Sequence, residues 1–324
     1  MKYRILGRTG IRVSEIGFGA WAIGSGWGDQ RESDSIDALH RALDLGVNFI
    51  DTALGYGAGK SERIIASVLK ERREEVVVAT KIPPLGAPWP PGPYCAARER
   101  YPEAYLREKL DECRANLQTD CIDILQLHTW TRAWNADPYP LDVLRKLQSE
   151  GKLRFIGIST PEHDQNSLND LMRAGYLDTV QVIFNIFEQE PAAEFLPIAL
   201  ESNVGVIVRV AFDEGVLTGK YRSGHQFPAD DFRSRYFAGD RLDRALSRVD
   251  KIRVELDGSG YDMPQAALKF ALSHPACSSV IAGIRNAAQA EANAMTADMP
   301  DLPESLLLRL RKHYWLRAFW YSGK

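Results

Sequence analysis

The chain has 324 residues, of which 45% are hydrophobic and 26% are charged, and a formal net charge of −3. These values are typical of a globular protein with a large core and argue against an intrinsically disordered chain. Lysine and arginine are scattered, which argues against a nucleic-acid-binding surface, and no apolar run approaches the about 20 residues of a membrane span. The first residues lack the apolar stretch of a signal peptide, so we expect a cytoplasmic protein.

The cysteines give no sign of a metal site or of a disulfide framework. They form no CxxC pair, and no histidine lies at metal-ligand spacing from them. We therefore predict free thiols and no bound metal, and a homo-oligomer stays an open alternative to a monomer. The four cysteines are Cys95, Cys113, Cys121 and Cys277.

The chain begins with a predicted hairpin, in which residues 3–6 and 13–16 flank a turn at 7–10. After it, short apolar segments alternate with amphipathic ones, which is typical of strands connected by crossover helices. The predicted strands are residues 18–20, 49–51, 76–81, 122–128, 155–159, 180–185, 204–210 and 279–282. The predicted helices are residues 35–45, 62–70, 103–117, 141–149, 167–174, 192–201 and 264–273, with an extra helix at 243–256.

This alternation favours an α/β fold, a (β/α)8 TIM barrel with an N-terminal β-hairpin and extra helices, formed by residues 1–324 as a single domain. A doubly wound open sheet is the alternative, but no GxGxxG motif follows a predicted strand. Two long loops, residues 83–101 and 211–240, follow the third and seventh strands. We expect them to cover the C-terminal face of the barrel, where active sites of this fold form.

Candidate catalytic residues stand at the ends of predicted strands. Asp51, Lys81 and His128 each end a strand, and Tyr56 follows Asp51 in a glycine-flanked turn. Each alone also fits a structural role, as a buried ion pair, a core tyrosine or a capping histidine. Together they suit carbonyl reduction by hydride, because the alkoxide that forms needs a proton donor. Tyr56 is that donor, Lys81 stabilises its phenolate, Asp51 balances Lys81, and His128 holds the substrate oxygen.

Three segments resemble those that carry the Asp, Tyr, Lys and His tetrad of the aldo-keto reductase superfamily. They are DTALGYG at 51–57, ATK at 79–81 and DILQLH at 123–128, and the resemblance extends from residues 17–21 through 59–62 to 289–293. It implies a barrel that reduces an aldehyde or ketone with NADP(H) as cofactor. A histidine rather than an acid at position 128 implies reduction of carbonyls rather than of carbon–carbon double bonds.

The same resemblance assigns the cofactor site. Ser159 and Gln181 are expected to hold the nicotinamide carboxamide, although Thr160 stands where the family usually has asparagine. Lys220 in a clasping loop would approach the pyrophosphate, and Arg285 or Arg233 would pair with a 2′-phosphate. The further expected cofactor contacts are Ala20, Trp21, Asp51, Val210, Leu217, Gly219, Gly283, Gln289 and Asn293.

One position departs from the family pattern. Many relatives carry after the seventh strand an aromatic residue that stacks on the nicotinamide, and Arg209 stands there in this chain. A guanidinium plane can stack on a ring but also brings charge. We therefore expect Arg209 to contact a cofactor phosphate or an anionic group of the substrate.

The expected partner is a small-molecule carbonyl substrate. We expect its pocket to be lined by Trp21, Tyr56, His128 and Trp130. Three other functions stay open. Lys81 could form a Schiff base, as in barrel aldolases. Some relatives are cofactor-sensing regulatory subunits of membrane channels that turn over slowly. A sugar or alcohol dehydrogenase would use the same residues in the oxidative direction.

Overall fold

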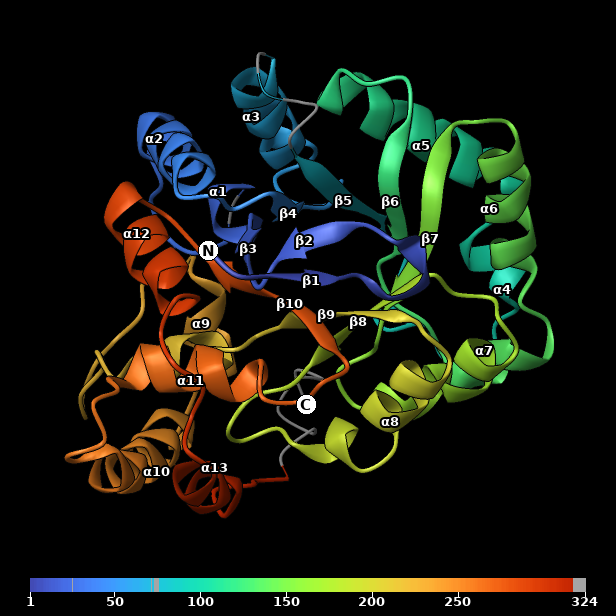
Figure 1. Cartoon of the computed structure of the whole chain (residues 1–324). Helices are drawn as coiled ribbons and strands as arrows, with labels where there is room; N and C mark the ends of the chain where they lie inside the picture. The colour runs from blue at the N-terminus through green and yellow to red at the C-terminus, as the bar shows by residue number, and fades with distance from the viewer. Residues whose placement is uncertain (25, 71, 73–75, 317–324) are drawn as a thin grey trace.

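The computed structural model describes residues 1–24, 26–70, 72 and 76–316. Eight strands form a closed barrel in which all neighbours run parallel, as the sequence predicted (Figure 1). The barrel closes between its first and last strands, where Phe18 pairs with Ala282. The strands are β3 (Ile16–Gly19), β4 (Phe49–Asp51), β5 (Val77–Ile82), β6 (Ile122–Leu127), β7 (Leu153–Ser159), β8 (Thr179–Ile183), β9 (Gly205–Arg209) and β10 (Cys277–Gly283).

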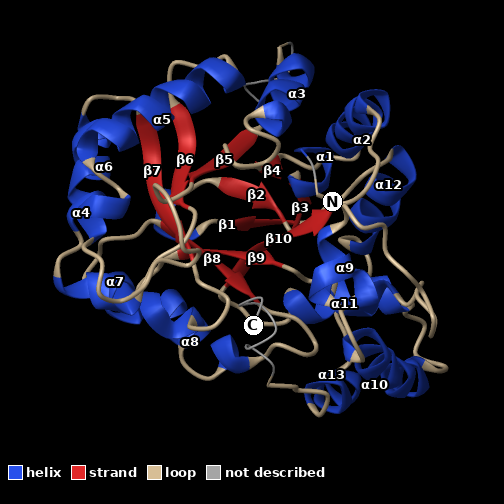
Figure 2. Cartoon of the chain, turned by 180° about the vertical axis from the view of Figure 1, so that it is seen from behind, coloured by secondary structure: helices blue, strands red, loops and turns tan. Residues whose placement is uncertain are grey.

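Helices surround the barrel and shield its strands from water (Figure 2). Because both faces of a parallel strand are covered in this way, the strands are mostly apolar and buried along their length, and all six residues of β6 are buried. The helices after successive strands are α2 (Glu32–Asp44), α3 (Lys60–Leu69), α5 (Glu103–Leu117), α6 (Tyr139–Ser149), α7 (Asn169–Arg173), α8 (Phe195–Glu201), α11 (Met263–Ala271) and α12 (Ala287–Thr296).

Other helices lie in the connections and at the C-terminal side. They are α1 (Trp21–Gly24), α4 (Ala97–Arg100), α9 (Phe232–Tyr236), α10 (Arg241–Leu256) and α13 (Glu304–Arg311). The extra helix predicted at 243–256 corresponds to α10, whereas α13 lies in a segment for which no helix was predicted. Among the described residues, none of the helices combines the length and apolar character needed to cross a membrane.

Two predicted helices are shorter than expected. The segments at 167–174 and 192–201 each begin with a 3-10 turn, η4 (Gln165–Leu168) and η5 (Glu190–Ala192), before α7 and α8 start. Glu194 separates η5 from α8 because its φ of −140° is not helical. Apolar periodicity does not distinguish a 3-10 turn from the first turn of an α-helix. The predicted helices therefore begin earlier than α7 and α8 do.

The N-terminal hairpin, β1 (Tyr3–Ile5) paired with β2 (Arg12–Ser14), lies across one end of the barrel (Figure 1). The side chains of Leu6 and Val13 are fully buried in an apolar cluster with residues of the barrel interior. Gly7 has a φ of +49°, and a Cβ there would lie 2.2 Å from the backbone nitrogen of Gly205 at the start of β9. The hairpin therefore plugs the N-terminal end of the barrel and leaves the opposite end for function.

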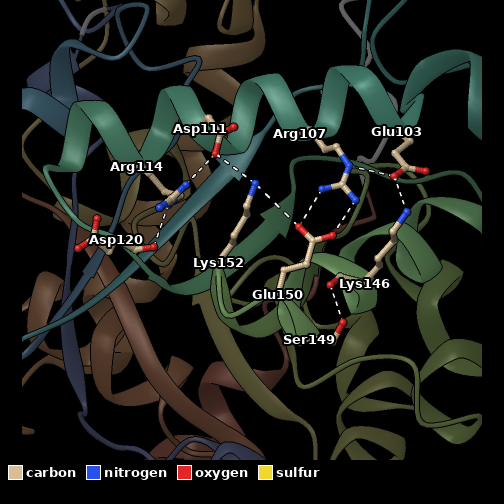
Figure 3. A network of polar contacts seen from close by, with 9 residues as sticks. All are labelled: Glu103, Arg107, Asp111, Arg114, Asp120, Lys146, Ser149, Glu150 and Lys152. Carbon is tan, nitrogen blue, oxygen red and sulfur yellow. Dashed lines mark hydrogen bonds and ion pairs between the residues drawn. The ribbon is translucent and has the colours of Figure 1, made fainter.

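Polar contacts on the outer surface join α5 to α6 and the start of β7 (Figure 3). Arg107 donates to both carboxylate oxygens of Glu150, at 2.9 and 2.8 Å, and to Glu103 at 2.9 Å. Lys146 on α6 also contacts Glu103, at 3.0 Å. Such exposed pairs contribute little individually, and the network's main effect is to fix the relative position of the two helices.

Candidate active site

Four polar residues meet at the C-terminal end of the barrel, where β4, β5 and β6 end. Lys81 is central: its Nζ donates to Asp51 Oδ1 at 2.5 Å and to the carbonyl of Thr52 at 2.8 Å, and it lies 3.5 Å from the Tyr56 hydroxyl. The rings of Tyr56 and His128 are 5.6 Å apart between centroids. Asp51 and Lys81 are buried, whereas Tyr56 and His128 are partly exposed. The structure thus brings together a buried ion pair beneath two accessible rings.

Strand register explains why Asp51 and Lys81 meet. Asp51 pairs with Ala79 on β5, and Lys81 lies two residues farther along the same strand. Side chains of a strand return to the same face every second residue, so Lys81 points to the same interior as Asp51. The backbone continues this pairing beyond β4, because the Leu54 amide donates to the Lys81 carbonyl at 3.0 Å.

Tyr56 is held by a tight turn between β4 and α3. The Tyr56 amide donates to the carbonyl of Ala53 at 3.0 Å, and the Gly59 amide donates to that of Leu54 at 2.8 Å. Gly57 has a φ of +65°, and a Cβ there would lie 2.5 Å from the carbonyl oxygen of Gly24 in α1. Only glycine allows this approach, so the motif's second glycine fixes the height of the phenol above Lys81.

Two glutamines complete the environment of Asp51. Gln126 on β6 and Gln181 on β8 donate through their side-chain nitrogens to Asp51 Oδ2, at 3.2 and 2.7 Å. Asp51 therefore accepts from Lys81 on one oxygen and from two amides on the other. A buried carboxylate with this many donors keeps its position and stays available to balance the lysine.

The electrostatic environment shifts the pKa values of the two accessible rings in opposite directions. Burial raises the pKa of Tyr56 above its ordinary value, while the cations of Lys81 and Arg209 act in the opposite direction. Burial, and then the same two cations, hold the pKa of His128 well below its ordinary value. Near neutral pH the site therefore presents a protonated phenol and a neutral imidazole.

Aromatic side chains from three connections at this end of the barrel surround these rings. The Trp21 ring stacks beside Tyr56 at 6.1 Å, and the Trp89 ring meets His128 edge-on at 5.1 Å. Trp21 also contacts Phe232, at 5.3 Å. Trp89 and Phe232 belong to the two long loops that were expected to cover this face. The mouth of the barrel is thus walled mainly by apolar rings, which suits a small organic substrate.

The structure places Trp130 differently from the expectation that it lines the substrate. Trp130 is fully buried, packs edge-on against Trp134 at 5.2 Å, and donates its ring N–H to Asn135 at 2.8 Å. These contacts are those of a core residue and do not support its assignment to the substrate wall. Trp89, which is 46% exposed, takes the place beside His128 that the sequence had suggested for Trp130.

Three residues at the C-terminal ends of β6, β7 and β9 carry buried polar atoms that have no hydrogen-bond partner among the described residues. Within the described part of the chain, Thr160 Oγ1, Arg209 Nε and His128 Nδ1 are buried and have no hydrogen-bond partner. Ser159 and Gln181 lie on the adjoining ends of β7 and β8 and are both buried. Native proteins rarely leave such atoms unpaired, so this group of donors and acceptors fits a bound polar molecule.

Three cations lie at the phosphate end. Partial burial, and then the charges of Arg233 and Arg285, lower the pKa of Lys220. Arg233 is buried and paired with Asp231 at 2.5 Å, and its guanidinium lies 4.4 Å from the Trp27 ring. All three guanidinium nitrogens of Arg233 donate to Asp231 or Tyr221, whereas only two of those of Arg285 have a partner among the described residues, so Lys220 and Arg285 are the better candidates for binding phosphate.

Arg285 is held at the edge of the mouth. Its Nε donates to Gln30 at 2.8 Å, its Nη2 donates to the carbonyl of Asp29, and its backbone amide donates to the Gln289 side chain at 2.9 Å. In the described chain the buried Nδ2 of Asn293 has no partner. Arg285 and Gln289 therefore lie next to each other at the start of α12, and Asn293 lies farther along the same helix.

The remaining predicted cofactor positions lie around the same end of the barrel. Ala20 follows β3, and its amide donates to the Asp51 carbonyl at 2.9 Å. Gly283 ends β10 and is exposed. Leu217 is buried and Gly219 has a φ of +70° in the loop after β9. Among the described residues, no group of three or more histidine, cysteine, aspartate or glutamate side chains could hold a metal ion.

Several residues near the site had no signal in the sequence analysis. Gln126 lies within the tetrad motif but was not assigned, although its position two residues before His128 places it on the inward face. Glu162, which contacts Arg209 at 3.5 Å, and Phe232 come from loops. Loop paths are not encoded in apolar periodicity, so no pattern pointed to them.

Comparisons with known proteins show the family to which the chain belongs. A model of the Aldo/keto reductase family matches residues 15–314. The aldo-keto reductase YhdN of Bacillus subtilis is 32% identical over 298 residues, covering 90% of this chain and 87% of YhdN. The NADH-specific methylglyoxal reductase of Escherichia coli is 28% identical, covering 95% of this chain and 97% of that protein.

The structural comparison supports the same grouping. An aldo-keto reductase of Bacillus halodurans, solved in its holo form, superimposes with a TM-score of 0.76 at 25% identity and covers 98% of each chain. The barrel, the tetrad and these matches lead to one conclusion. The chain belongs to the aldo/keto reductase family and is an NAD(P)H-dependent oxidoreductase of small carbonyl substrates.

Proposed function

We propose that this enzyme reduces a small aldehyde or ketone to the alcohol with NADPH, and that Tyr56 donates the proton. The observation that carries the proposal is the 3.5 Å approach of the Lys81 ammonium to the Tyr56 hydroxyl. A nearby cation makes a phenol a better acid, because it stabilises the phenolate that remains after proton transfer. The nicotinamide cofactor supplies the hydride when it is bound.

His128 and Tyr56 hold the carbonyl oxygen from two sides in this proposal. A lowered pKa keeps His128 neutral, so one ring nitrogen can donate a hydrogen bond without competing for the proton of Tyr56. Trp21 and Trp89 close the walls and exclude water from the reacting atoms. Substrate contacts are therefore assigned to Trp21, Tyr56, His128 and Trp89.

Lys81 serves as a positioning cation rather than as a Schiff-base nucleophile. Its Nζ makes close contacts with Asp51 and with the Thr52 carbonyl, and the side chain is fully buried. A Schiff base requires a neutral amine that can reach the substrate carbon. The accessible groups of the tetrad are Tyr56 and His128, which supports proton donation over imine formation.

The assignment of NADPH over NADH rests on the cationic end of the site. Lys220 and Arg285 act on each other electrostatically, and a phosphate between them would relieve that repulsion. Ser159 and Gln181 hold the carboxamide in this proposal. Ala20, Trp21, Asp51, Val210, Leu217, Gly219, Gly283, Gln289 and Asn293 adjoin the rest of the cofactor.

The test is cofactor oxidation by the purified full chain with a panel of sugar, short dicarbonyl and aromatic aldehydes. We expect NADPH to be oxidised in proportion to the alcohol formed, and faster than NADH at equal concentration. Bound NADPH that no carbonyl oxidises would contradict the proposal and indicate a cofactor sensor. Turnover of alcohols with NADP⁺ but no measurable reduction would also contradict it and indicate a dehydrogenase.

A further inference from the structure

Arg209 occupies the centre of the candidate cofactor site. It ends β9 and pairs in register with Ile183 on β8, which lies two residues beyond Gln181. Its Nη2 donates to the carbonyl of Thr160 at 3.0 Å, directly after Ser159 at the end of β7. The side chain therefore crosses the end of β8 and reaches the end of β7, next to Ser159.

The backbone next to Arg209 is held in an unusual conformation. Val210 has a φ of +59°, which a β-branched residue rarely adopts. Asn185 donates to the Val210 carbonyl at 2.9 Å and stabilises this conformation. A strained backbone conformation of this kind persists only where the surrounding contacts hold it, and such conformations are common at functional sites. Here the Val210 conformation sets the path of the chain as it leaves β9, directly after Arg209.

The charge of Arg209 is only partly compensated. Its carboxylate partner is Glu162, at 3.5 Å through one oxygen, and the two side chains are 16% and 23% exposed. Arg209 Nε is buried and, within the described residues, has no hydrogen-bond partner. The field of the cation reaches the catalytic rings, since it acts to lower the pKa of both Tyr56 and His128.

We propose that Arg209 selects the redox state of the cofactor, so that NADPH binds more tightly than NADP⁺. This inference rests on the proposed function. A nicotinamide ring is cationic when oxidised and neutral when reduced, and a fixed cation beside it repels only the oxidised form. The two cofactors carry the same adenosine and phosphates, so contacts to those groups cancel when their affinities are compared as a ratio.

This role agrees better with the contacts than the two roles expected from the sequence. An anionic substrate group at Arg209 would meet the carboxylate of Glu162, which repels it. The contacts of Arg209 lie at the end of β7, whereas the cations that act on Lys220 are Arg233 and Arg285. Weak binding of NADP⁺ speeds its release after each turnover and favours carbonyl reduction over alcohol oxidation.

The test measures dissociation constants of NADPH and NADP⁺ for the purified full chain without substrate, by calorimetry or tryptophan fluorescence. Removing the charge in Arg209→Met should lower the ratio Kd(NADP⁺)/Kd(NADPH) by about tenfold, mainly through tighter NADP⁺ binding. Arg209→Lys keeps the charge and should keep most of the ratio. Glu162→Gln removes the compensating charge and should raise the ratio.

The outcomes separate this inference from the function on which it rests. If both nucleotides bind and the ratio is the same in wild type, Arg209→Met and Glu162→Gln, the inference is wrong while the proposed function stands. A wild-type chain that binds neither nucleotide overturns both. Should Arg209→Met fail to fold, Glu162→Gln alone decides, because an unchanged or lower ratio in that variant contradicts the role of the charge.

Discussion

The hydroxyl of Tyr56 lies 3.5 Å from the ammonium of Lys81, which itself contacts Asp51 at 2.5 Å. This chain of contacts runs from the buried interior to the accessible mouth. It links the stability of the barrel to its chemistry, because the charge that assists Tyr56 is also a charge that must be compensated inside the protein.

Removing Lys81 should impair both stability and catalysis. In Lys81→Met, the buried Asp51 loses its cationic partner, and breaking a buried pair in this way costs about 3–5 kcal/mol. The double variant Asp51→Asn with Lys81→Met should be more stable than the single variant, since no charge is left unpaired. Urea unfolding of the three proteins measures this. Equal stability of the single and double variants would show that the pair is not coupled.

His128 should make the folded state less stable as the pH falls. Its pKa in the folded state is well below the ordinary value of 6.5, so the unfolded chain binds a proton first as the solution is acidified. The free energy of unfolding therefore decreases below about pH 6.5 and keeps decreasing until the folded-state pKa is reached. His128→Gln should lose less stability than wild type between about pH 7.5 and about pH 5.5 in urea unfolding. An identical loss in both proteins would refute this assignment.

Two tryptophans offer a matched comparison between substrate contact and core packing. Trp89→Ala removes a ring beside His128 and should raise KM for aromatic aldehydes with little effect on stability. Trp130→Ala empties a fully buried site and should reduce stability by about 3–5 kcal/mol. Steady-state kinetics and thermal unfolding of both variants test the pair. The opposite pattern would restore Trp130 to the substrate wall.

Arg285 should determine the preference for NADPH over NADH. Hydrogen bonds to charged groups contribute about 1.5–3 kcal/mol, so Arg285→Ala should weaken NADPH binding by about tenfold or more and leave NADH binding little changed. Arg173→Ala on α7, an exposed arginine with a partner at 3.9 Å, is the control and should change neither affinity. Equal weakening of both cofactors by Arg285→Ala would argue that this arginine contacts another part of the dinucleotide.

The barrel and the tetrad were predictable because both follow from local rules. Strand residues such as those of β6 are buried on both faces, and polar residues at the ends of such strands must meet at one end of a closed barrel. The positions of Asp51, Lys81 and His128 depend only on strand register. Tyr56 is fixed by a glycine turn of known geometry, which the motif displays directly.

The walls of the site were not predictable in the same way. Whether Trp89 or Trp130 faces His128 depends on the path of a loop, and no sequence period encodes that path. Arg233 was a candidate for the 2′-phosphate, yet it pairs with the neighbouring Asp231 and lies over the ring of Trp27. The contact with Trp27 joins segments that are far apart in the chain, so it could not be predicted from local sequence.

The most direct test of the account is the rate of hydride loss from bound NADPH in a single turnover of Tyr56→Phe, measured by stopped flow with an aldehyde that wild type reduces. Loss of general acid catalysis should slow this step by about 10²–10⁴-fold while the affinity for NADPH stays nearly unchanged, because the variant lacks only the hydroxyl. A Tyr56→Phe protein that oxidises NADPH as fast as wild type would show that the proton comes from another group.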